Sequence, residues 1–458
     1  MKVVICGAGQ VGFGIAERLA NERNDVAVVD RDERLLQAMS DQLDVRTVLG
    51  HGSHPDVLAR AGLAQADMLI AVTHVDEVNM VACQLAHSLF NVPSKVARVR
   101  AQAYLAPEYA SLYSRDSLPI DVVISPEIEV GETVLRRLGM RGAVEAVPFA
   151  DGEVMFLGVP CEDQCPILET PLRQLTGLFP DLKSVVVGVQ RGADLLVPTG
   201  EDRLHAGDIA FVCAPKDQVG RTLALFGREN MPPRRIVIAG GGQIGLYVAQ
   251  ELERRTPAMS VTLIESSRDR AQQIAQSLKH AIVLHGSALD QGILREADIA
   301  NADLMIALTN DDQVNVLSSV MAKRLGAQQN LCLVNNRSYP QFVRGLGIDA
   351  YLDPRAITIS RILQHVRRGR IRNVHALLEG AAEVIETEAL DSSPLIGRPL
   401  RELRELRGVR IGAIIRNGKV LFPAGDQLIV PNDRVVLFAL RSTEKQIEQL
   451  FRVSLEFF

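Results

Sequence analysis

The pattern of apolar and polar positions repeats once along the chain. Residues 3–20 read VVICGAGQVGFGIAERLA and residues 236–253 read IVIAGGGQIGLYVAQELE, and each is an apolar run followed by a glycine cluster and a helical pattern. In both copies, short β-rich apolar runs then alternate with further helical patterns. This alternation predicts βαβ units built around a parallel sheet.

The two copies stay in register beyond the glycine clusters. The run VAVVD ends at Asp30 where VTLIE ends at Glu265, and HGS recurs at 51–53 and 285–287. The stretch ADMLIAVT at 66–73 returns as ADLMIALT at 302–309, and PIDVVISPE at 119–127 corresponds to GIDAYLDPR at 347–355. We therefore predict an α/β chain with two tandem Rossmann-like domains, each containing a doubly wound parallel sheet.

A smaller element follows each copy. Residues 186–192 (VVGVQRG) and 411–418 (IGAIIRNG) are short strands that end in turn residues, which predicts a small α+β subdomain with hairpins. The stretch GRENMPPRR at 227–235 is the clearest linker, because its paired prolines disfavour helix. The predicted domains are a nucleotide-binding domain at 1–135, a subdomain at 140–226, a second nucleotide-binding domain at 233–366 and a second subdomain at 372–456.

Composition narrows the function classes. The net charge is −5, aromatic residues make up 4% of the chain and Trp is absent, so we expect no nucleic acid partner. Six scattered cysteines favour a reducing compartment, and Cys161 and Cys165 lack the second ligand pair of a zinc site, so we expect no metal. No apolar stretch approaches the ~20 residues of a membrane span and no signal peptide precedes the first strand, so we expect a soluble chain that reaches a membrane only through a partner.

The glycine clusters carry the clearest chemistry. Each has the spacing GxGxxG after a predicted strand and before a predicted helix, with an acidic residue about 20 residues later. The first glycine makes the tight turn, the second admits a pyrophosphate and the third allows close helix packing. Asp30 and Glu265 would accept hydrogen bonds from ribose hydroxyls and disfavour a 2′-phosphate, which favours NAD(H) or an adenine nucleotide. The glycines of the two GxGxxG motifs are Gly7, Gly9, Gly12, Gly240, Gly242 and Gly245.

Other candidate contacts have structural alternatives. Thr73 and Thr309 follow the fourth predicted strand, where ligands bind, but Thr73-x-x-Asp76 and Thr309-x-x-Asp312 also resemble helix capping boxes. His51 could line an adenine pocket or be structural. Arg98 could reach a phosphate or be a solvated residue at a strand end.

The sequence lacks an evident catalytic domain. Nearly all of the chain belongs to the two repeated units, and we see no nucleophile elbow and no acid–base constellation in the small subdomains. We therefore expect no enzyme. The alternatives are an NAD-dependent oxidoreductase and a scaffold whose glycine loops bind nothing.

The order of these motifs resembles the TrkA family, the RCK (KTN) regulators of bacterial Trk potassium uptake systems. GAGQVG, VVD, GHGSHPDVLARAG, ADMLIAVT, DEVNMVACQLAHSLFN and PIDVVISPE carry the resemblance in the first copy, and GGGQIG and ALTNDDQVN carry it in the second. The resemblance covers essentially the whole chain and includes both small subdomains.

The resemblance implies a peripheral regulator on the cytoplasmic face of the inner membrane, assembled as a homo-oligomer, usually a tetramer, on a TrkH- or TrkG-type potassium-translocating subunit. It implies that NAD(H), and also ATP or ADP, bind the Rossmann units and gate the channel. The first nucleotide would contact Gly7, Ala8, Gly9, Gln10, Val11, Gly12, Asp30, His51, Thr73, His74 and Arg98. The second would contact Gly240, Gly241, Gly242, Gln243, Ile244, Gly245, Glu265 and Thr309, and the change from Asp30 to Glu265 leaves its identity open.

Overall fold

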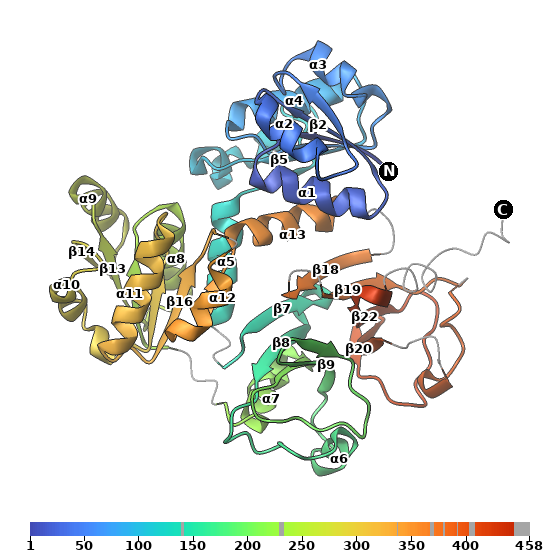
Figure 1. The fold of residues 1–458 in the computed structure, drawn as a ribbon, viewed down its shortest axis with the longest axis vertical. Helices are drawn as coiled ribbons and strands as arrows, with labels where there is room; N and C mark the ends of the chain where they lie inside the picture. Colours follow the sequence, from blue (N-terminus) through green and yellow to red (C-terminus); the bar gives the residue numbers. More distant parts are fainter. Residues whose placement is uncertain are drawn as a thin grey trace. The chain divides into compact units, whose positions relative to one another are not determined.

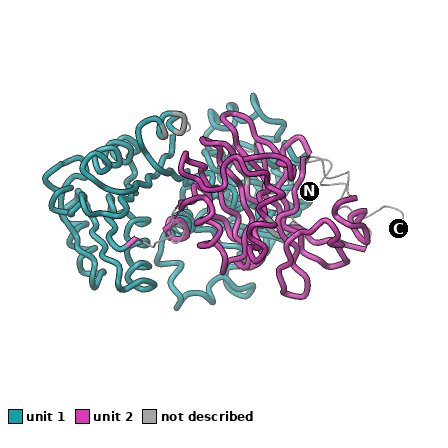
Figure 2. The backbone as a smooth tube through the Cα atoms, turned by 90° about the horizontal axis from the view of Figure 1, so that it is seen from below, with its two compact units in different colours: residues 1–133, 234–366 teal, residues 134–233, 367–458 magenta. Residues whose placement is uncertain are grey.

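The structure is a computed structural model of the 458-residue chain. It describes residues 1–138, 142–228, 233–336, 338–366, 371–378, 381–391, 393–402 and 408–443. The chain forms two compact units, and each combines segments from both halves of the sequence (Figure 2). Residues 1–133 and 234–366 form unit 1, and residues 134–233 and 367–458 form unit 2.

Unit 1 contains two six-stranded parallel sheets. The first has the order β3-β2-β1-β4-β5-β6, so the strand order reverses between β1 and β4. Its strands are β1 (Lys2–Cys6), β2 (Asp25–Asp30), β3 (Arg46–Leu49), β4 (Met68–Ala71), β5 (Ser94–Arg98) and β6 (Val122–Ile124). Its helices are α1 (Gln10–Asn21), α2 (Glu33–Ser40), α3 (Pro55–Arg60), α4 (Asp76–Ser88) and α5 (Pro126–Leu138).

The second sheet repeats this topology, with the order β14-β13-β12-β15-β16-β17. Its strands are β12 (Arg235–Ala239), β13 (Ser260–Glu265), β14 (Ile282–His285), β15 (Leu304–Ala307), β16 (Gln329–Leu333) and β17 (Ala350–Leu352). Its helices are α8 (Gln243–Arg255), α9 (Arg268–Ser277), α10 (Gln291–Glu296), α11 (Asp312–Arg324), α12 (Pro340–Val343) and α13 (Pro354–Val366).

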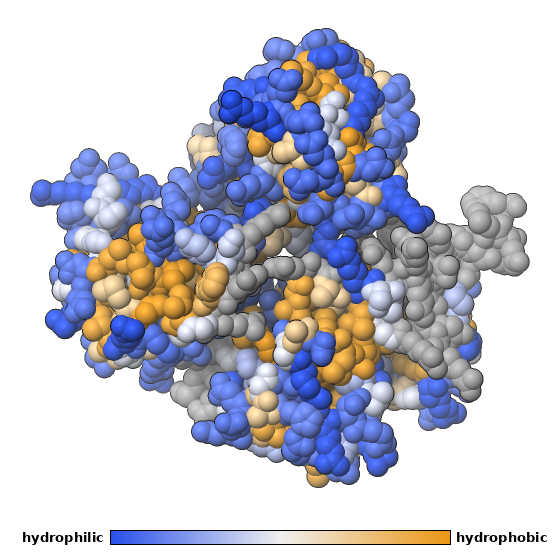
Figure 3. Space-filling view, in the orientation of Figure 1, coloured by the Kyte–Doolittle hydropathy of each residue, from blue (hydrophilic) through white to orange (hydrophobic). Residues whose placement is uncertain are grey.

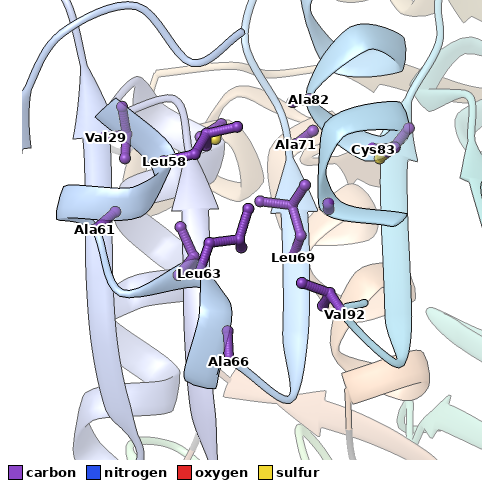
Figure 4. Close-up of a cluster of buried hydrophobic side chains, with 14 of the residues drawn as sticks. Val29, Leu58, Ala61, Leu63, Ala66, Leu69, Ala71, Ala82, Cys83 and Val92 are labelled. Atoms are coloured by element: carbon purple, nitrogen blue, oxygen red, sulfur yellow. The ribbon is translucent and has the colours of Figure 1, made fainter. Parts of the chain in front are cut away.

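The central strands of both sheets are buried on both faces, which is why they read as continuous apolar runs. All four residues of β4 and of β15 are buried. Figure 4 shows one side of the first sheet, where Leu69 of β4 lies among Leu58, Leu63 and Val92 from the surrounding segments. This packing holds the carboxyl ends of the strands at one fixed edge.

Within unit 1, the last helix of each sheet contacts the other sheet's first helix. Helix α13 follows the second sheet but packs on α1 (Figure 1), and a β-carbon on Gly14 would lie 2.4 Å from Ile359. Ile362 of α13 is buried in the core of the first sheet. In return, Glu132 of α5 accepts a hydrogen bond from Tyr247 of α8 at 2.7 Å. No pattern in the sequence indicated this exchange of helices.

Unit 2 contains two five-stranded antiparallel sheets, with the orders β10-β9-β11-β8-β7 and β18-β19-β22-β20-β21. The first has β7 (Glu145–Phe149), β8 (Val154–Pro160), β9 (Val185–Arg191), β10 (Asp194–Leu196) and β11 (Ile209–Pro215), with α6 (Leu172–Leu178) and α7 (Val219–Leu225). The second has β18 (Ile371–Leu377), β19 (Ala382–Glu388), β20 (Val409–Arg416), β21 (Lys419–Leu421) and β22 (Arg434–Leu440).

The two antiparallel sheets pack face to face through aromatic side chains. The ring of Phe211 stacks between those of Phe156 and Phe438, with centroid separations of 5.6 and 6.0 Å. A β-carbon on Gly188 would lie 2.6 Å from the Phe438 ring, so the sheets meet closely at this glycine. The small subdomains therefore share one core, which the sequence did not predict.

The predicted fold class is confirmed, with two Rossmann-like domains and two small α+β subdomains. The hairpin at Asn417 and Gly418 is also present, and both residues have positive φ angles. The predicted linker falls partly outside the described residues, at 229–232. The domain limits remain predictions.

Candidate functional site

The first glycine loop connects β1 to α1. Gly7 has a φ of +116°, a conformation that favours glycine, and its amide donates to the Val29 carbonyl at 2.8 Å. A β-carbon on Gly12 would lie 1.8 Å from the Gly7 carbonyl oxygen, so any side chain there would push the helix away. At Gly9 a β-carbon would lie no closer than 3.7 Å to other protein atoms, so the space above this residue is open.

Helix α1 begins without a side-chain cap. Gly9 is its N-cap residue and forms no side-chain hydrogen bond there, and the first turn, with Gln10 and Val11, contains no acidic residue. The amides at such a helix start attract anions through their N–H groups and the helix dipole. The geometry is that of an anion-binding loop.

Asp30 lies at the end of β2 and holds the loop in place. Its carboxylate accepts from the Ala8 amide at 2.6 Å and from the Asp32 amide at 2.9 Å. Each oxygen keeps a further lone pair, so the carboxylate can still accept from a hydroxyl group. Asp30 therefore lies where the sequence predicted a ribose contact.

The residues after β3 and β4 lie at the same sheet edge. The loop after β3 contacts β1, since a β-carbon on Gly52 would lie 3.2 Å from the Cys6 side chain. Here His51 Nδ1 lies 2.8 Å from Ser53 Oγ, and its ring stacks on that of His54. His51 thus has a local structural role as well as a place near the loop.

The capping-box prediction is wrong in both copies. Helix α4 has Val75 as its N-cap residue, and Thr73 instead pairs with Asn79, whose Oδ1 accepts from the Thr73 amide at 2.8 Å and from its hydroxyl at 2.7 Å. Asp76 accepts from the amides of Arg100 and Ala101, because the loop after β5 supplies closer donors than the threonine amide. In the second copy, Asp311 caps α11 while Thr309 pairs with Asn315.

Arg98 adds positive charge beside the first loop, next to the ring of His74. Arg98 is 7% exposed, and one guanidinium nitrogen donates to the Thr73 carbonyl at 2.8 Å and lies 3.5 Å from His74 Nδ1. Burial lowers the pKa of Arg98, and its Nε has no hydrogen-bond partner among the described residues. The position Gly9 Cβ would occupy lies 3.7 Å from His74 Nε2, so Gly9, His74 and Arg98 converge. Arg98 is therefore not a solvated residue at a strand end, which was the structural alternative to a phosphate contact.

The second glycine loop has the same geometry. Gly240 has a φ of +102°, and a β-carbon on Gly245 would lie 2.0 Å from the Gly240 carbonyl oxygen. Gly242 is the uncapped N-cap residue of α8, and a β-carbon there would meet nothing within 4 Å. Gln243 and Ile244 form the first turn of that helix.

Glu265 takes the place of Asp30 in the second loop. Its carboxylate accepts from the Gly241 amide and the Ser267 amide, both at 2.8 Å. Arg270, which the sequence did not single out, donates from Nε to the Gly241 carbonyl at 3.0 Å. Thr309 lies at the end of the neighbouring strand, and its amide donates to Asn315 at 2.9 Å.

Comparison with known proteins identifies the family. The TrkA-N domain matches residues 3–126 and 236–354, and the TrkA-C domain matches residues 162–227 and 384–452. The chain belongs to the TrkA family.

Relatives in this family match over their full length. The Trk system potassium uptake protein TrkA of Azorhizobium caulinodans is 63% identical over 458 residues, which is 100% of both chains. The protein of the same name from Halomonas elongata is 41% identical over 462 residues, again 100% of both. The GsuK RCK domain has the same fold, with a TM-score of 0.60 at 20% identity over 98% of this chain and 94% of that one.

The two segments that match the TrkA-N domain are the two parallel-sheet domains that contain the glycine loops. The sequence did not assign a role to Asn79 and Asn315, although both occupy the same place after the repeated threonine. That repeated spacing was the signal that could have revealed them.

In the described part of the chain, no cluster of three His, Cys, Asp or Glu residues could hold a metal ion, and no helix is long and apolar enough to cross a membrane.

Proposed function

We propose that this chain is the cytoplasmic, nucleotide-binding regulatory subunit of a bacterial Trk-type potassium uptake system, and that it gates a membrane channel without catalysing a reaction. Full-length relatives at 63% and 41% identity are named Trk system potassium uptake protein TrkA. The proposal places the chain at the cytoplasmic face of the inner membrane, on a TrkH- or TrkG-type subunit.

The observation that carries the proposal is the duplicated loop. In both copies the second glycine leaves open space above an uncapped helix N-terminus, and a carboxylate at the end of the next strand accepts from the loop amide. An anion fits over the helix start and a ribose hydroxyl fits the carboxylate. The proposed contacts are those that the sequence predicted around both loops.

The ligand class we propose is NAD(H), with ATP or ADP as competitors. Asp30 and Glu265 carry negative charge where the 2′-phosphate of NADP would lie, which disfavours that cofactor. The GsuK channel, which has this fold at 20% identity, has been determined with NAD bound.

We propose a homo-oligomer, most simply a tetramer. Figure 3 shows apolar side chains gathered over the region of α11 and α12, and Leu317, Phe342 and Leu346 are each half exposed or more. Contiguous apolar surface of this kind marks contact with another protein. Burial of this face in an assembly would remove it from water.

The exchanged helices offer a route for coupling within unit 1. Helix α1 begins at the phosphate loop at Gly9, and further along it Gly14 contacts Ile359 of α13. A ligand that shifts α1 therefore changes the surface on which α13 packs. If the channel favours one arrangement of α13, ligand and channel are linked, with a coupling free energy of about 1–3 kcal/mol per site.

The test is potassium or rubidium uptake at low external potassium in cells that lack this chain and any paralogue. The wild-type chain should restore uptake, and the double variant Gly9→Ala/Asp30→Ala should not. The alanine methyl group at position 9 would fill the space of the pyrophosphate, although it would contact no protein atom within 3.7 Å. Gly220→Ala, in helix α7 of unit 2, is the matched control and should restore uptake fully.

Two results would refute the proposal. Uptake that does not depend on the chain at all would remove the transport function. Steady oxidation of NADH with a small substrate by the purified chain would show an enzyme instead.

A further inference from the structure

Two helix junctions in unit 1 occupy equivalent places in the repeat. Helix α13 packs on α1 in one junction, and α5 packs against α8 in the other. The aligned stretches VGFG (11–14) and IGLY (244–247) make Gly14 the counterpart of Tyr247. The aligned stretches PIDVVISPE and GIDAYLDPR lead into α5 and α13 and make Gly131 the counterpart of Ile359. The two junctions can therefore be compared residue by residue.

At one contact point the two junctions combine a small and a large residue in opposite ways. In the first junction the glycine is on α1, and a β-carbon on Gly14 would lie 2.4 Å from the Ile359 side chain of α13. In the second junction the glycine is on the incoming helix α5, and a β-carbon on Gly131 would lie 2.3 Å from the Tyr247 ring of α8. Each junction thus joins one glycine to one large side chain, with the glycine on opposite partners.

Neither glycine has room for a side chain where its junction closes. Gly14 and Gly131 are both buried, and both distances are far shorter than a van der Waals contact of ~3.5–4.0 Å. Ile359 also packs against the core of the first sheet, so it is held in place on its other side. The sizes of the two residues at the contact point therefore decide whether two of these helices fit together.

The charged groups follow the same division. Glu132 of α5 accepts from the Tyr247 hydroxyl at 2.7 Å and pairs with Arg255 in the last turn of α8. In the other junction Ser360 stands at the place of Glu132, and Glu22 stands at the place of Arg255. A pairing of α5 with α1 would therefore bring Glu132 to a second carboxylate instead of to a cation, which is unfavourable.

Two copies of the chain offer an alternative pairing, in which like domains of different chains exchange these helices. Helix α5 of one chain would then pack on α1 of the other, and Gly131 would meet Gly14 over a void. Helix α13 would pack on α8, and Ile359 would overlap with Tyr247. A void and an overlap of side chains both destabilise a packed interface.

We propose that this opposite placement of glycine and large side chain selects the partner of each sheet, so that the two Rossmann-like domains of one chain pair with each other and reject a like domain of a second chain. The surface of α1 at Gly14 accepts a helix with a branched side chain at the contact point. The surface of α8 at Tyr247 accepts a helix with glycine there. Each closed pair then contains one glycine loop of either kind, and the inference does not depend on what those loops bind.

Paired substitutions in the full chain test the fit. Gly131→Ile should overlap with the Tyr247 ring and Tyr247→Gly should leave a void, so each should lower the midpoint of thermal unfolding by several degrees. The double variant copies the arrangement of the other junction and should lose clearly less than the sum of the two. Gly220→Ile is the control for isoleucine in a helix, because a β-carbon there would meet nothing within 4 Å, and it should cause no such loss.

The inverted variant Gly131→Ile/Ile359→Gly tests the choice of partner. Within one chain it sets isoleucine against Tyr247 and glycine against Gly14, whereas like domains of two chains would now fit. The added substitutions Glu22→Cys/Glu132→Cys detect the like pairing, because α5 on α1 of another chain would bring the two thiols together. A short bismaleimide should then join two chains of the inverted variant into a covalent dimer on a denaturing gel, and should not join wild-type chains.

Two controls complete the crosslinking experiment. Gly131→Ile/Tyr247→Gly shares one substitution with the inverted variant but keeps the fit within the chain, so it should give no covalent dimer. Glu132→Cys/Arg255→Cys should be crosslinked inside the wild-type chain, since these two side chains are paired there. All six native cysteines are buried and compete little for the reagent.

Three results would overturn the inference and leave the proposed function intact. The first is a double variant whose loss equals the sum of the single losses, because the two residues would then not be fitted to each other. The second is a covalent dimer that forms as readily in wild type as in the inverted variant. The third is an inverted variant that folds and gives no covalent dimer. If the inverted variant does not fold, the thermal comparison decides.

Discussion

The side-chain amide of Asn79 lies 2.9 Å from the main-chain carbonyl oxygen of Arg98 and ties helix α4 to the end of β5. Asn315 makes the same contact with the Leu333 carbonyl at 3.1 Å in the second copy. Both asparagines are fully buried, and each also accepts from the threonine at the end of the neighbouring strand. These contacts fix the sheet edge at which the proposed ligand binds.

Asn79→Ala should destabilise the first domain of unit 1 by about 1–3 kcal/mol, because the Thr73 amide and the Arg98 carbonyl lose their partner inside the protein. In urea unfolding of the full chain, this destabilisation should lower the urea concentration at the midpoint of the first unfolding transition. Gln276→Ala, at an exposed position in α9, is the control and should leave the midpoint in place. A change in Asn79→Ala no larger than in that control would show that water replaces the amide.

Gly12→Ala and Gly220→Ala should have opposite effects, although both glycines lie in helices. The added methyl group would lie 1.8 Å from the Gly7 carbonyl oxygen at position 12 but would meet nothing within 4 Å at position 220. We expect Gly12→Ala to lower both stability and nucleotide affinity at the first loop. Gly220→Ala should raise stability by roughly 0.5–1 kcal/mol through helix propensity. Equal effects on thermal unfolding would contradict the packing described for Gly12.

Arg434→Met should cost about 3–5 kcal/mol in unit 2, because it leaves the Glu386 carboxylate buried without its cation. Glu386 is 2% exposed, pairs with Arg434 and accepts from the Ala150 amide at 3.0 Å. Arg401→Met is the control, since Arg401 and Asp426 form a pair on the surface and its loss should cost at most about 1 kcal/mol. Chemical denaturation of the two variants gives the comparison, and similar losses would argue against a buried pair.

Glu251→Gln should alter the pH dependence of stability in unit 1. A hydrogen bond from Arg254, aided by one from Arg255, lowers the pKa of Glu251 below its usual range. A carboxyl group whose pKa is lowered by folding contributes stability above its unfolded pKa of about 4.3 and loses that contribution as the pH falls through the folded value. The difference in free energy of unfolding between wild type and variant should therefore be largest at pH 7 and should disappear in acid. Unfolding curves that stay equally far apart down to pH 3 would contradict this assignment.

The glycine-loop elements could be predicted because their signals are local. The turn at Gly7, the close approach at Gly12 and the acid at Asp30 each depend on residues within one βαβ unit, so spacing alone indicates them. The repeat then predicts the same geometry at Gly240, Gly245 and Glu265. The hairpin at Asn417 and Gly418 follows from local backbone preference in the same way.

The capping-box prediction failed because the sequence near Thr73 does not contain the competing donors. The Asp76 carboxylate instead accepts from the amides of Arg100 and Ala101, which lie more than 20 residues further along the chain. The role of Asn79 was missed for the same reason, because its partner Arg98 belongs to the next strand.

The sequence by itself therefore determined the class of fold, the two glycine loops and their acidic partners, since these depend on periodicity and on contacts between near neighbours. Only the tertiary structure decided which helix covers which sheet, as with α13 on α1, and that the two antiparallel sheets share a core at Phe211. It also placed Gly14 against Ile359 and Gly131 against Tyr247 in the two helix junctions. Such features join segments far apart in the chain, and local preferences carry no information about which distant surfaces will bury one another.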